Sequence, residues 1–549
     1  MALMEKDKPQ AEVKPEAVPE QSAPVAAAAT PIKAKGFRRY SDLEYLRLNV
    51  WQKFVYRLLC FFVAIPKWFK NLGLKIWHGI KKISLAIAHE AQDIVMTFIH
   101  GDWKTKTSYV VMGFGNIARG QVLRGILFLA FEVIFILYMV FWGGYWIGML
   151  PSLGKQGPAE EYNEELDTYT TVYHDNSFKI LLYGILTLFF IVALIYTWRL
   201  NIKQNKISEE ILKSGKPLKS GKQDLRSLID DEFHKTLLAL PVTGILVFTV
   251  MPIFFMILVA FTNYSGATNN GYTNNLFHWI GWDNFNTLLN WNGGGSAYSA
   301  AFGEVLAWTI MWAFFATFSN YFLGMLVAIM INKKGIHLKK VWRTILVLTI
   351  AIPQFISLLY VSKMFADNGF IIKWMQDWGW VDGNFSFFGD KANPWISRLM
   401  VILINIWIGI PYLMLIATGI LMNIPEDLYE SARIDGANVW QQYTKITLPY
   451  MLFVTGPYLL TSFIGNMNNF NVIYLLTGGG PTNGALSAAS GSVGYTDLLI
   501  TWLYKITMGA NSEYYMASVI GILVFVVSAV ISVVVYNFMP SNKNEEEFQ

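Results

Sequence analysis

Two apolar stretches carry polar or small residues at intervals of four and three positions. These residues are Asn405, Gly409 and Tyr412 in the first stretch, and Ser462, Asn466 and Asn469 in the second. Residues at such intervals share one face of a helix. Amide and hydroxyl groups donate and accept hydrogen bonds, so each face suits a ligand rich in hydroxyl groups. The alternative is that the amides only join neighbouring helices, because polar side chains in an apolar helix are costly without partners.

The rest of the sequence offers no candidate for covalent chemistry, a metal or a nucleotide. The seven histidines show no metal-ligand spacing, and no order of Ser, His and Asp suggests a nucleophile. The sequence GFGNIA at Gly113 matches a dinucleotide pattern but follows no predicted strand. Gly215 to Lys222 resembles a phosphate-binding loop, yet it is one residue too long and has Gln223 where Ser or Thr is required. We expect no catalytic residue, metal or cofactor on this chain; if ATP drives the protein, another polypeptide binds it.

The composition is that of an integral membrane protein. Of 549 residues, 54% are hydrophobic and only 15% are charged, and a soluble chain of this size needs more charge to cover its surface. The single cysteine, Cys60, excludes an intrachain disulfide. The net charge of +5 is modest and the basic residues cluster beside apolar stretches, so nucleic acid is not an expected partner.

Eight stretches are long and apolar enough to cross a bilayer, which needs about 20 helical residues. They are Gln121–Trp146, Phe178–Trp198, Thr236–Thr262, Phe302–Ile331, Thr344–Val361, Leu399–Met422, Tyr450–Leu475 and Tyr514–Phe538. The sequence therefore predicts an all-α, polytopic membrane protein.

The distribution of Lys and Arg orients these spans, because basic residues accumulate on the cytoplasmic side. Arg199–Lys235 carries nine of them and Asn332–Arg343 carries five. By contrast, Asn263–Ala301 carries none, and Pro151–Ser177 has one lysine against six acids. This alternation places both termini, and the segment Asn423–Pro449, in the cytoplasm.

The ends of the chain differ from the spans. Residues 1–36 are rich in Pro, Ala, Glu and Lys and have no apolar core, which predicts a disordered cytoplasmic tail and not a cleavable signal. Residues 539–549 resemble a second solvated tail. In residues 37–119, apolar residues alternate with lysines at helical spacing. Two interpretations stay open for them: helices lying on the cytoplasmic membrane surface, or a small helical hairpin packed on the protein.

The segment Asn423–Pro449 carries the signals of a short helix outside the membrane. Pro425 suits the first turn of a helix, the two acids after it suit the positive end, and Gly436 suits the stop. We expect a helix of roughly 11 residues there, followed by a second helical piece, Asn438–Thr444, before the chain re-enters the membrane. An ordered loop of this length is more often functional than a mere connector.

Within this segment the residues Glu430-Ser-Ala432, Gly436 and Ile446-Thr-Leu448-Pro449 resemble the EAA motif of ABC importer permeases (E-A-A-x3-G-x9-I-x-L-P). The resemblance implies a coupling helix that rests in a cleft of an ATPase subunit. Glu430 would pair with a basic group on that subunit, and Gly436 would allow the bend between the two short helices. Ser431 replaces an alanine and is small enough to keep the packing. The implied coupling residues are Glu430, Ser431, Ala432, Asp435 and Gly436.

Eight spans with this motif between the sixth and seventh resemble the MalF-type permease of maltose/maltodextrin importers, from about Gly120 to Phe538. The stretches from Asn405 to Tyr412, from Ser462 to Phe470 and TGGGP at Thr477 are similar to stretches of that family. The resemblance implies a sugar site in the spans, where amides bond to hydroxyls and an aromatic face meets the sugar ring. The implied site residues are Asn405, Ile408, Gly409, Tyr412, Ser462, Gly465, Asn466 and Asn469.

Two departures from that family bear on the substrate. Gly465 stands where the maltose permease has a phenylalanine, which removes a stacking surface and enlarges the pocket. The loop Asn263–Ala301 is far shorter than the large extracytoplasmic domain of the enterobacterial protein.

A carboxylate within a span, Glu132, is by default a functional candidate. Because its span lies outside the transport core that the resemblance implies, we expect Glu132 to have a structural partner or to be protonated.

The resemblance implies a type I ABC importer permease in a bacterial cell membrane, with no enzymatic activity of its own. Its implied partners are a second, MalG-like permease, two ATPase subunits that bind ATP and Mg, and an extracytoplasmic sugar-binding protein. Alternatives are a permease for another oligosaccharide, an ion-coupled secondary transporter, and a membrane scaffold or sensor. The expected regions are the tail 1–36, interfacial helices 37–119, transmembrane helices 1–3 (120–262), the outer loop 263–301, transmembrane helices 4–8 (302–538, including the coupling loop 423–449) and the tail 539–549.

Overall fold

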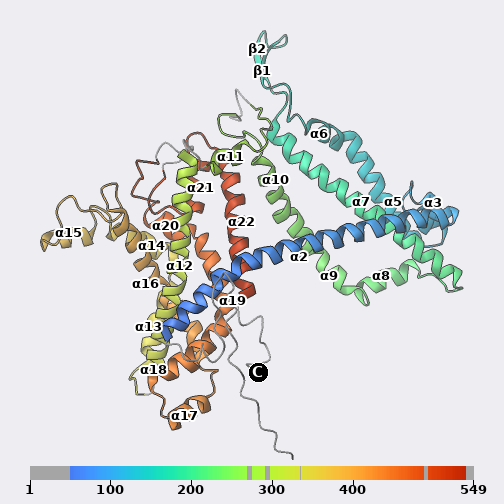
Figure 1. Cartoon of the computed structure of the whole chain (residues 1–549). Helices are drawn as coiled ribbons and strands as arrows, with labels where there is room; N and C mark the ends of the chain where they lie inside the picture. Colours follow the sequence, from blue (N-terminus) through green and yellow to red (C-terminus); the bar gives the residue numbers. More distant parts are fainter. Residues whose placement is uncertain (1–49, 269–274, 291–296, 334, 487–492, 539–549) are drawn as a thin grey trace, which may run out of the picture. The chain divides into compact units, whose positions relative to one another are not determined.

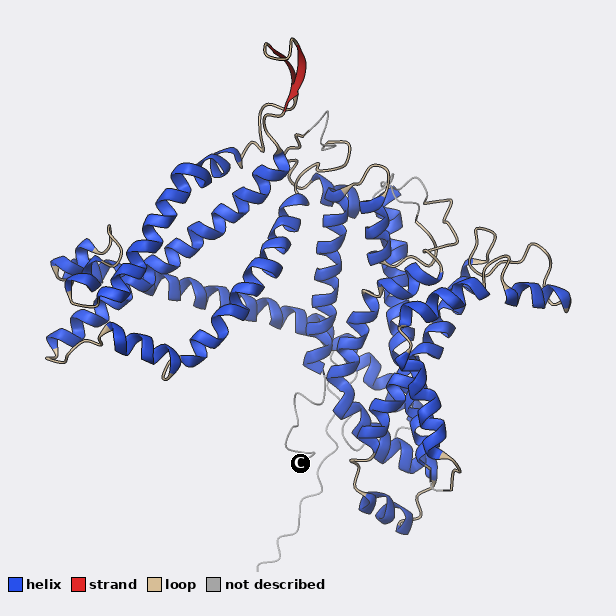
Figure 2. Ribbon diagram, turned by 180° about the vertical axis from the view of Figure 1, so that it is seen from behind, coloured by secondary structure: helices blue, strands red, loops and turns tan. Residues whose placement is uncertain are grey.

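The computed structural model describes residues 50–268, 275–290, 297–333, 335–486 and 493–538. Helices dominate these residues, and the one sheet among them is an antiparallel hairpin of β1 (Ala159–Asn163) and β2 (Thr168–Val172). Figure 2 shows this hairpin in red against the blue helices. The all-α prediction is confirmed, while the sequence analysis did not anticipate the hairpin. The tails 1–36 and 539–549, and residues 37–49, lie outside the described residues.

The chain divides into two units, Met1–Ala88 and His89–Gln549. The described part of the first unit is the beginning of α2 (Val50–His100), one continuous helix with Pro66 inside it. Trp77 and Ile83 are exposed on it, and lysines lie between them at helical spacing. The sequence analysis left open surface helices or a helical hairpin in this part of the chain. Over Val50–His100 the structure has one continuous helix and no hairpin. Its placement on a membrane surface stays a prediction.

The second unit consists of long helical runs joined by loops and short helices (Figure 1). The long runs, with π-helical segments marked η, are α5–η1–α6 (Val122–Tyr138, Met139–Gly143 and Gly144–Met149), α7 (Ser177–Lys213), α9–η2–α10 (Phe233–Ile245, Leu246–Val250 and Met251–Val259), α12 (Ala297–Asn332), α13 and α14 (Lys339–Ala351 and Gln354–Met364), α16 (Pro394–Leu421), α18–η3–α19 (Val439–Gln442, Tyr443–Thr447 and Leu448–Met467) and α22 (Tyr514–Phe538). The short helices are α3 (Trp103–Thr107), α4 (Phe114–Ala118), α8 (Gly221–Ile229), α11 (Asp283–Leu289), α15 (Phe370–Asp377), α17 (Glu426–Ile434), α20 (Phe470–Leu476) and α21 (Leu499–Met508).

Eight of these runs correspond to the eight predicted spans. Among the described residues, seven helices are long and apolar enough to cross a membrane, and the pair α13 and α14 makes eight if it forms one span. That pair is bent by 89°, so the span predicted for Thr344–Val361 is not one unbroken helix. The break falls at Pro353, because a proline disfavours helical geometry at the residue before it, and Ile352 is accordingly extended.

The run that follows the coupling segment is longer than predicted. The second helical piece predicted for Asn438–Thr444 is present as α18, which Asn438 caps, but it does not end before the membrane: Val439–Met467 forms one span-length helix. The π-helical segment η3 lies just before Pro449, which has no N–H to donate to the preceding turn. A π-bulge absorbs this irregularity without ending the helix. As a result, α18 continues through η3 into α19.

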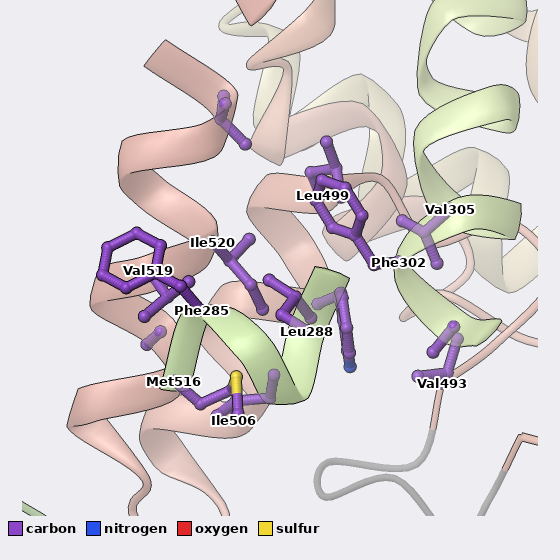
Figure 3. Close-up of a cluster of buried hydrophobic side chains, with 14 of the residues drawn as sticks. Phe285, Leu288, Phe302, Val305, Val493, Leu499, Ile506, Met516, Val519 and Ile520 are labelled. Carbon is purple, nitrogen blue, oxygen red and sulfur yellow. The ribbon is translucent and has the colours of Figure 1, made fainter. Parts of the chain in front are cut away.

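Helix α12 lies at the centre of the packing. It contacts α16 and α19 along its length through a buried cluster that includes Tyr321, Met325, Met414 and Met451. A second cluster joins its other end to α11, α21 and α22. Figure 3 shows its members: Phe285, Leu288, Phe302, Val305, Val493, Leu499, Ile506, Met516, Val519 and Ile520. These contacts hold α12 against α16 and α19, the two helices that carry Asn405 and Asn466.

A buried polar network joins α3, α4 and α7. The side chain of Arg119 is only 1% exposed; it lies 2.5 Å from a carboxylate oxygen of Asp102 and donates to Asn205 at 2.7 Å. Burial raises the pKa of Asp102, but hydrogen bonds from Thr105 and the charge of Arg119 outweigh this and leave the pKa below its usual value. Nearby, the backbone N–H of Met112 donates to Glu132 at 2.8 Å. Glu132 therefore has the structural partner that the sequence analysis expected.

Candidate functional site

The face of α16 that carries Asn405 and Gly409 packs against α12. A side chain at Gly409 would collide with the amide of Asn320, so only glycine lets the two helices approach this closely. Asn405 and Asn320 are both buried, 5% and 7% exposed. The Nδ2 atom of Asn405 and the Oδ1 atom of Asn320 have no hydrogen-bond partner among the described residues. Buried polar atoms are nearly always paired, so these two atoms are exceptions among the described residues.

The face of α19 that carries Asn466 also packs against α12, one helical turn from Asn320. Asn466 donates from Nδ2 to the hydroxyl of Thr317 at 2.9 Å, and its carbonyl accepts from the indole N–H of Trp312 at 3.1 Å. Thr317 precedes Asn320 by three residues, so both lie on one face of α12. Asn405, Gly409 and Asn466 therefore converge on this face. The amide of Asn466 joins helices, as the alternative interpretation of the sequence held.

Asn469 does not share a helix face with Ser462 and Asn466, and that prediction is wrong. The span predicted for Tyr450–Leu475 breaks after Met467, and Asn469 caps the next helix, α20, by accepting from the backbone N–H of Val472 at 3.3 Å. Its Nδ2 atom bonds to Oδ1 of Asn466 at 3.3 Å, so the two amides are still neighbours. Asn side chains compete with the backbone for hydrogen bonds, which favours caps over helix interiors.

We call Thr317, Asn320, Asn405 and Asn466 the polar region. The other predicted site residues on α16 and α19 differ in how far they are exposed. Tyr412 is 51% exposed, and its hydroxyl lies near enough to Tyr458 of α19 to interact electrostatically. Ser462 lies close to Tyr458, one turn earlier on α19. Ile408 packs, half-buried, on the apolar cluster between α12, α14 and α16. Gly465 faces open space, since a side chain added there would meet no atom within 4 Å.

Two residues of this region were missed in the sequence analysis, Thr317 and Asn320. Both lie in the apolar stretch Phe302–Ile331 and are three positions apart. This is the same polar spacing that drew attention to the other two stretches. The sequence therefore held the same indication for Thr317 and Asn320, but the family stretches used for the prediction did not contain these two residues.

The coupling segment forms the expected short helix, α17, with Pro425 immediately before it and two acids in its first turn. The helix ends in a Schellman motif: the N–H of Gly436 donates to Arg433 at 3.0 Å, and the N–H of Ala437 donates to Ala432 at 2.8 Å. Gly436 has φ +77°, a left-handed conformation that glycine adopts without strain. The prediction that Gly436 stops the helix is confirmed. The helix has 9 residues where roughly 11 were expected.

The surface of this segment is unusually apolar. Ile434 is 86% exposed, Val439 82% and Trp440 70%. They lie beside the exposed residues Glu430 and Ser431. Contiguous exposed apolar side chains with a charged neighbour are typical of a surface that binds another protein. On its inner side, α17 is tied to the start of the following span, because the hydroxyls of Tyr429 and Thr447 lie 2.8 Å apart.

The motifs set aside in the sequence analysis have structural roles. Gly113 lies at the start of α4, after a turn and not after a strand, and its N–H donates to Asn201 at 3.0 Å. Ser220 caps α8 next to Lys222. In the part of the chain that the structure describes, no three His, Cys, Asp or Glu side chains gather as metal ligands.

Most of this chain is similar in sequence to known proteins. The family described as "Binding-protein-dependent transport system inner membrane component" matches residues 320–543. The galactooligosaccharides transport system permease protein GanP of Bacillus subtilis is 33% identical over 452 residues, which cover 80% of this chain and 97% of GanP. The maltodextrin transport system permease protein MalC of Streptococcus pneumoniae is 31% identical over 437 residues, 78% of this chain and 93% of MalC.

The enterobacterial relative matches over a shorter length. The maltose/maltodextrin transport system permease protein MalF of Escherichia coli is 33% identical over 260 residues, which cover 46% of this chain and 48% of MalF. The resemblance drawn from the EAA motif and the site stretches is thereby confirmed. The chain belongs to the family of binding-protein-dependent transport system inner membrane components and is a membrane-embedded sugar ABC permease of the MalF type, a transport component and not an enzyme.

Proposed function

We propose that this permease translocates a maltodextrin, driven by ATP hydrolysis on a separate subunit that docks on α17. The observation that carries this proposal is the connection between α17 and α19. Gly436 turns the chain from α17 into α18, which continues through η3 into α19. The same α19 carries Ser462 and Asn466. A displacement of α17 is thereby transmitted along one continuous helix to the polar region.

The docking surface is formed by Glu430, Ser431, Ala432, Asp435 and Gly436, together with the exposed apolar residues around them. Glu430 supplies a charge for a basic group of the ATPase subunit. Ile434 and Trp440 supply apolar area for its groove. Amphipathic helices bind grooves in this way. This arrangement requires α17, and with it both termini, to lie in the cytoplasm, in agreement with the distribution of Lys and Arg.

The sugar site comprises Asn405, Ile408, Gly409, Tyr412, Ser462, Gly465, Asn466 and Asn469, and we add Asn320 and Thr317. The unpaired atoms of Asn405 and Asn320 offer one donor and one acceptor to a sugar hydroxyl. The exposed ring of Tyr412 offers an apolar face to the sugar ring. A second, MalG-like permease completes the cavity, two ATPases bind ATP and Mg, and an external binding protein delivers the sugar.

A second candidate substrate is a galactooligosaccharide. GanP is named for that sugar and matches this chain at 33% identity over nearly its whole length. The two substrates differ in the orientation of hydroxyls that amide groups can distinguish. Uptake of the two sugar series by the same vesicles discriminates between them.

The proposal is tested by purification of the intact transporter and by the variant Glu430→Gln. We expect an ATPase and a second permease to copurify, and maltodextrin to stimulate ATP hydrolysis. Glu430→Gln should weaken recovery of the ATPase, because it removes the charge while keeping the side-chain shape. Asp427→Asn, one turn earlier on the same helix and also exposed, is the matched control. Uptake that follows a proton or sodium gradient and needs no ATP would overturn the proposal.

A further inference from the structure

The structure contains a pocket of about 620 Å³, open on one side and here called the outer cavity, that the sugar site does not include. Its wall is built from the loop Phe388–Asp390, the end of α20, the glycine-rich turn after it, and α21. The loop immediately precedes the first residue of α16, whereas α17 follows the last one. The 28 residues of α16 rise about 42 Å, so the cavity and α17 lie at opposite ends of the spans. If α17 is cytoplasmic, as proposed above, this cavity opens outside the cell.

The lining of the cavity combines aromatic rings with polar groups. Tyr474 is 40% exposed and packs edge-on against Tyr504, with ring centroids 5.2 Å apart. The carboxylate of Asp390 accepts from the hydroxyl of Thr482 at 3.0 Å. Lys505 brings an ammonium group to the same wall. A few polar groups placed among aromatic rings in a cavity of this size are typical of a small-ligand site.

The wall is fixed by a buried ion pair. Asp497 is fully buried and accepts from Nζ of Lys505 at 2.6 Å, from the N–H of Gly494 at 2.8 Å and from the hydroxyl of Thr501 at 2.9 Å. Gly479 lies so close to this carboxylate that a side chain there would collide with it. The cavity is therefore preorganised by its own charged pair and is not a gap between mobile loops.

The charges indicate the class of ligand. The ammonium of Lys505 is compensated by Asp497, which leaves the carboxylate of Asp390 as the uncompensated charge of the wall. An anionic ligand such as a uronate would be repelled by that carboxylate. A neutral sugar, in contrast, can donate hydroxyls to Asp390 and rest a ring on Tyr474 or Tyr504.

We infer that this cavity is an outer subsite for a neutral oligosaccharide chain, which holds sugar units beyond those at the polar region of α16 and α19. Helix α20 connects the two places, with Asn469 at its start and Thr477 of the cavity after its end. Its 7 residues rise about 10 Å, so a ligand seated at Asn469 contacts the far side of the cavity only if it extends over at least that distance. The inference rests on the proposed function for its choice of sugar.

Equilibrium binding to the purified transporter in lipid nanodiscs tests this inference, with maltose and maltoheptaose as probes. Tyr504→Ala should weaken maltoheptaose binding by up to about tenfold, because the contact between the sugar and the aromatic ring is lost. Maltose binding should change less than twofold. Asp390→Ala should show the same length dependence. Tyr536→Ala, which removes an exposed tyrosine from α22, is the matched control and should leave both affinities unchanged.

The remaining outcomes overturn the inference. Equal affinities of Tyr504→Ala and wild type for maltoheptaose would exclude the subsite. An equal loss for both sugars in Tyr504→Ala and Asp390→Ala would also exclude the subsite, because the effect would not depend on chain length. Failure of the wild type to bind maltoheptaose would exclude glucans from the cavity. Uptake by vesicles is measured separately: length-dependent binding without ATP-driven uptake would contradict the proposed function and leave the subsite standing.

Discussion

The hydroxyl of Tyr429 on α17 lies 2.8 Å from the hydroxyl of Thr447, at the point where the chain enters α19. Thr447 is buried, so this bond is shielded from water. It connects the middle of α17 to the base of the span that carries Ser462 and Asn466. The loop between the two residues is thereby closed by a side-chain bond as well as by the turn at Gly436. A force on α17 reaches α19 by both routes.

Tyr429→Phe should weaken this connection while leaving the ring in place. Loss of a partly buried hydrogen bond costs about 1 kcal/mol, which corresponds to about fivefold in a coupling equilibrium. We expect less sugar to be imported per ATP hydrolysed, as measured in vesicles with the intact transporter. Tyr536→Phe, on the exposed part of α22, is the control. An unchanged ratio of sugar to ATP would remove Tyr429 from the coupling path.

Gly436→Ala should uncouple transport through backbone strain. Its φ of +77° costs a non-glycine residue about 1–2 kcal/mol, and nothing packs against the position. Gly215→Ala is a close control, because Gly215 has φ +73° and ends α7 with the same pair of backbone bonds. Both variants should lose similar thermal stability, and only Gly436→Ala should lower the sugar imported per ATP. Equal effects on transport would mean that strain alone, and not coupling, is responsible.

The sequence predicts the coupling segment well because its signals are local. Pro425 and Gly436 each act on the residues next to them, so their roles follow from residue type. The continuity of α18 with α19 could not be predicted in the same way. Pro449 is typical of the first turn of a helix, so the sequence favours a new helix there. The π-helical segment η3 instead carries the helix past the proline.

Gly409→Ala should perturb the polar region through Asn320. The added methyl group would collide with the Asn320 amide, which is buried and must swing away to make room. We expect the KM for maltodextrin to rise several-fold, since the overpacked site loses about 1–3 kcal/mol of well-placed contacts. Gly419→Ala, on the same helix with no atom within 4 Å of the added carbon, should leave the KM unchanged. A normal KM for Gly409→Ala would place the sugar elsewhere.

Gly465→Phe should alter which sugars are accepted without unfolding the protein. The position faces open space, so the ring has room, and it supplies a stacking surface of the kind that contributes about 0.5–1.5 kcal/mol. We expect tighter binding of short glucans and poorer acceptance of long ones in competition assays with chains of graded length. Gly148→Phe in α6, also in open space, is the control. An unaltered length profile would show that Gly465 does not face the sugar.

The polar region itself is only partly predictable from the sequence. Asn405, Gly409 and Asn466 are marked by their spacing within apolar stretches. Their convergence on the face of α12 that carries Thr317 and Asn320 depends on how α12 is aligned with α16 and α19, and no local pattern sets that alignment. The break at Asn469 was missed because its neighbours are apolar enough for a continuous span, while the side chain instead caps α20.

Crosslinking from α17 tests the central claim most directly. The chain has one cysteine, so Cys60→Ser gives a cysteine-free background into which Ser431→Cys is introduced. In the intact transporter, Cys-specific crosslinking should join this position to the ATPase subunit, whereas Thr171→Cys on the exposed β2 strand should give no such product. The account predicts that the ATPase protects Ser431→Cys from reagents on the cytoplasmic side. Labelling of that cysteine by an impermeant reagent from outside the cell, or full accessibility in the assembled complex, would contradict it.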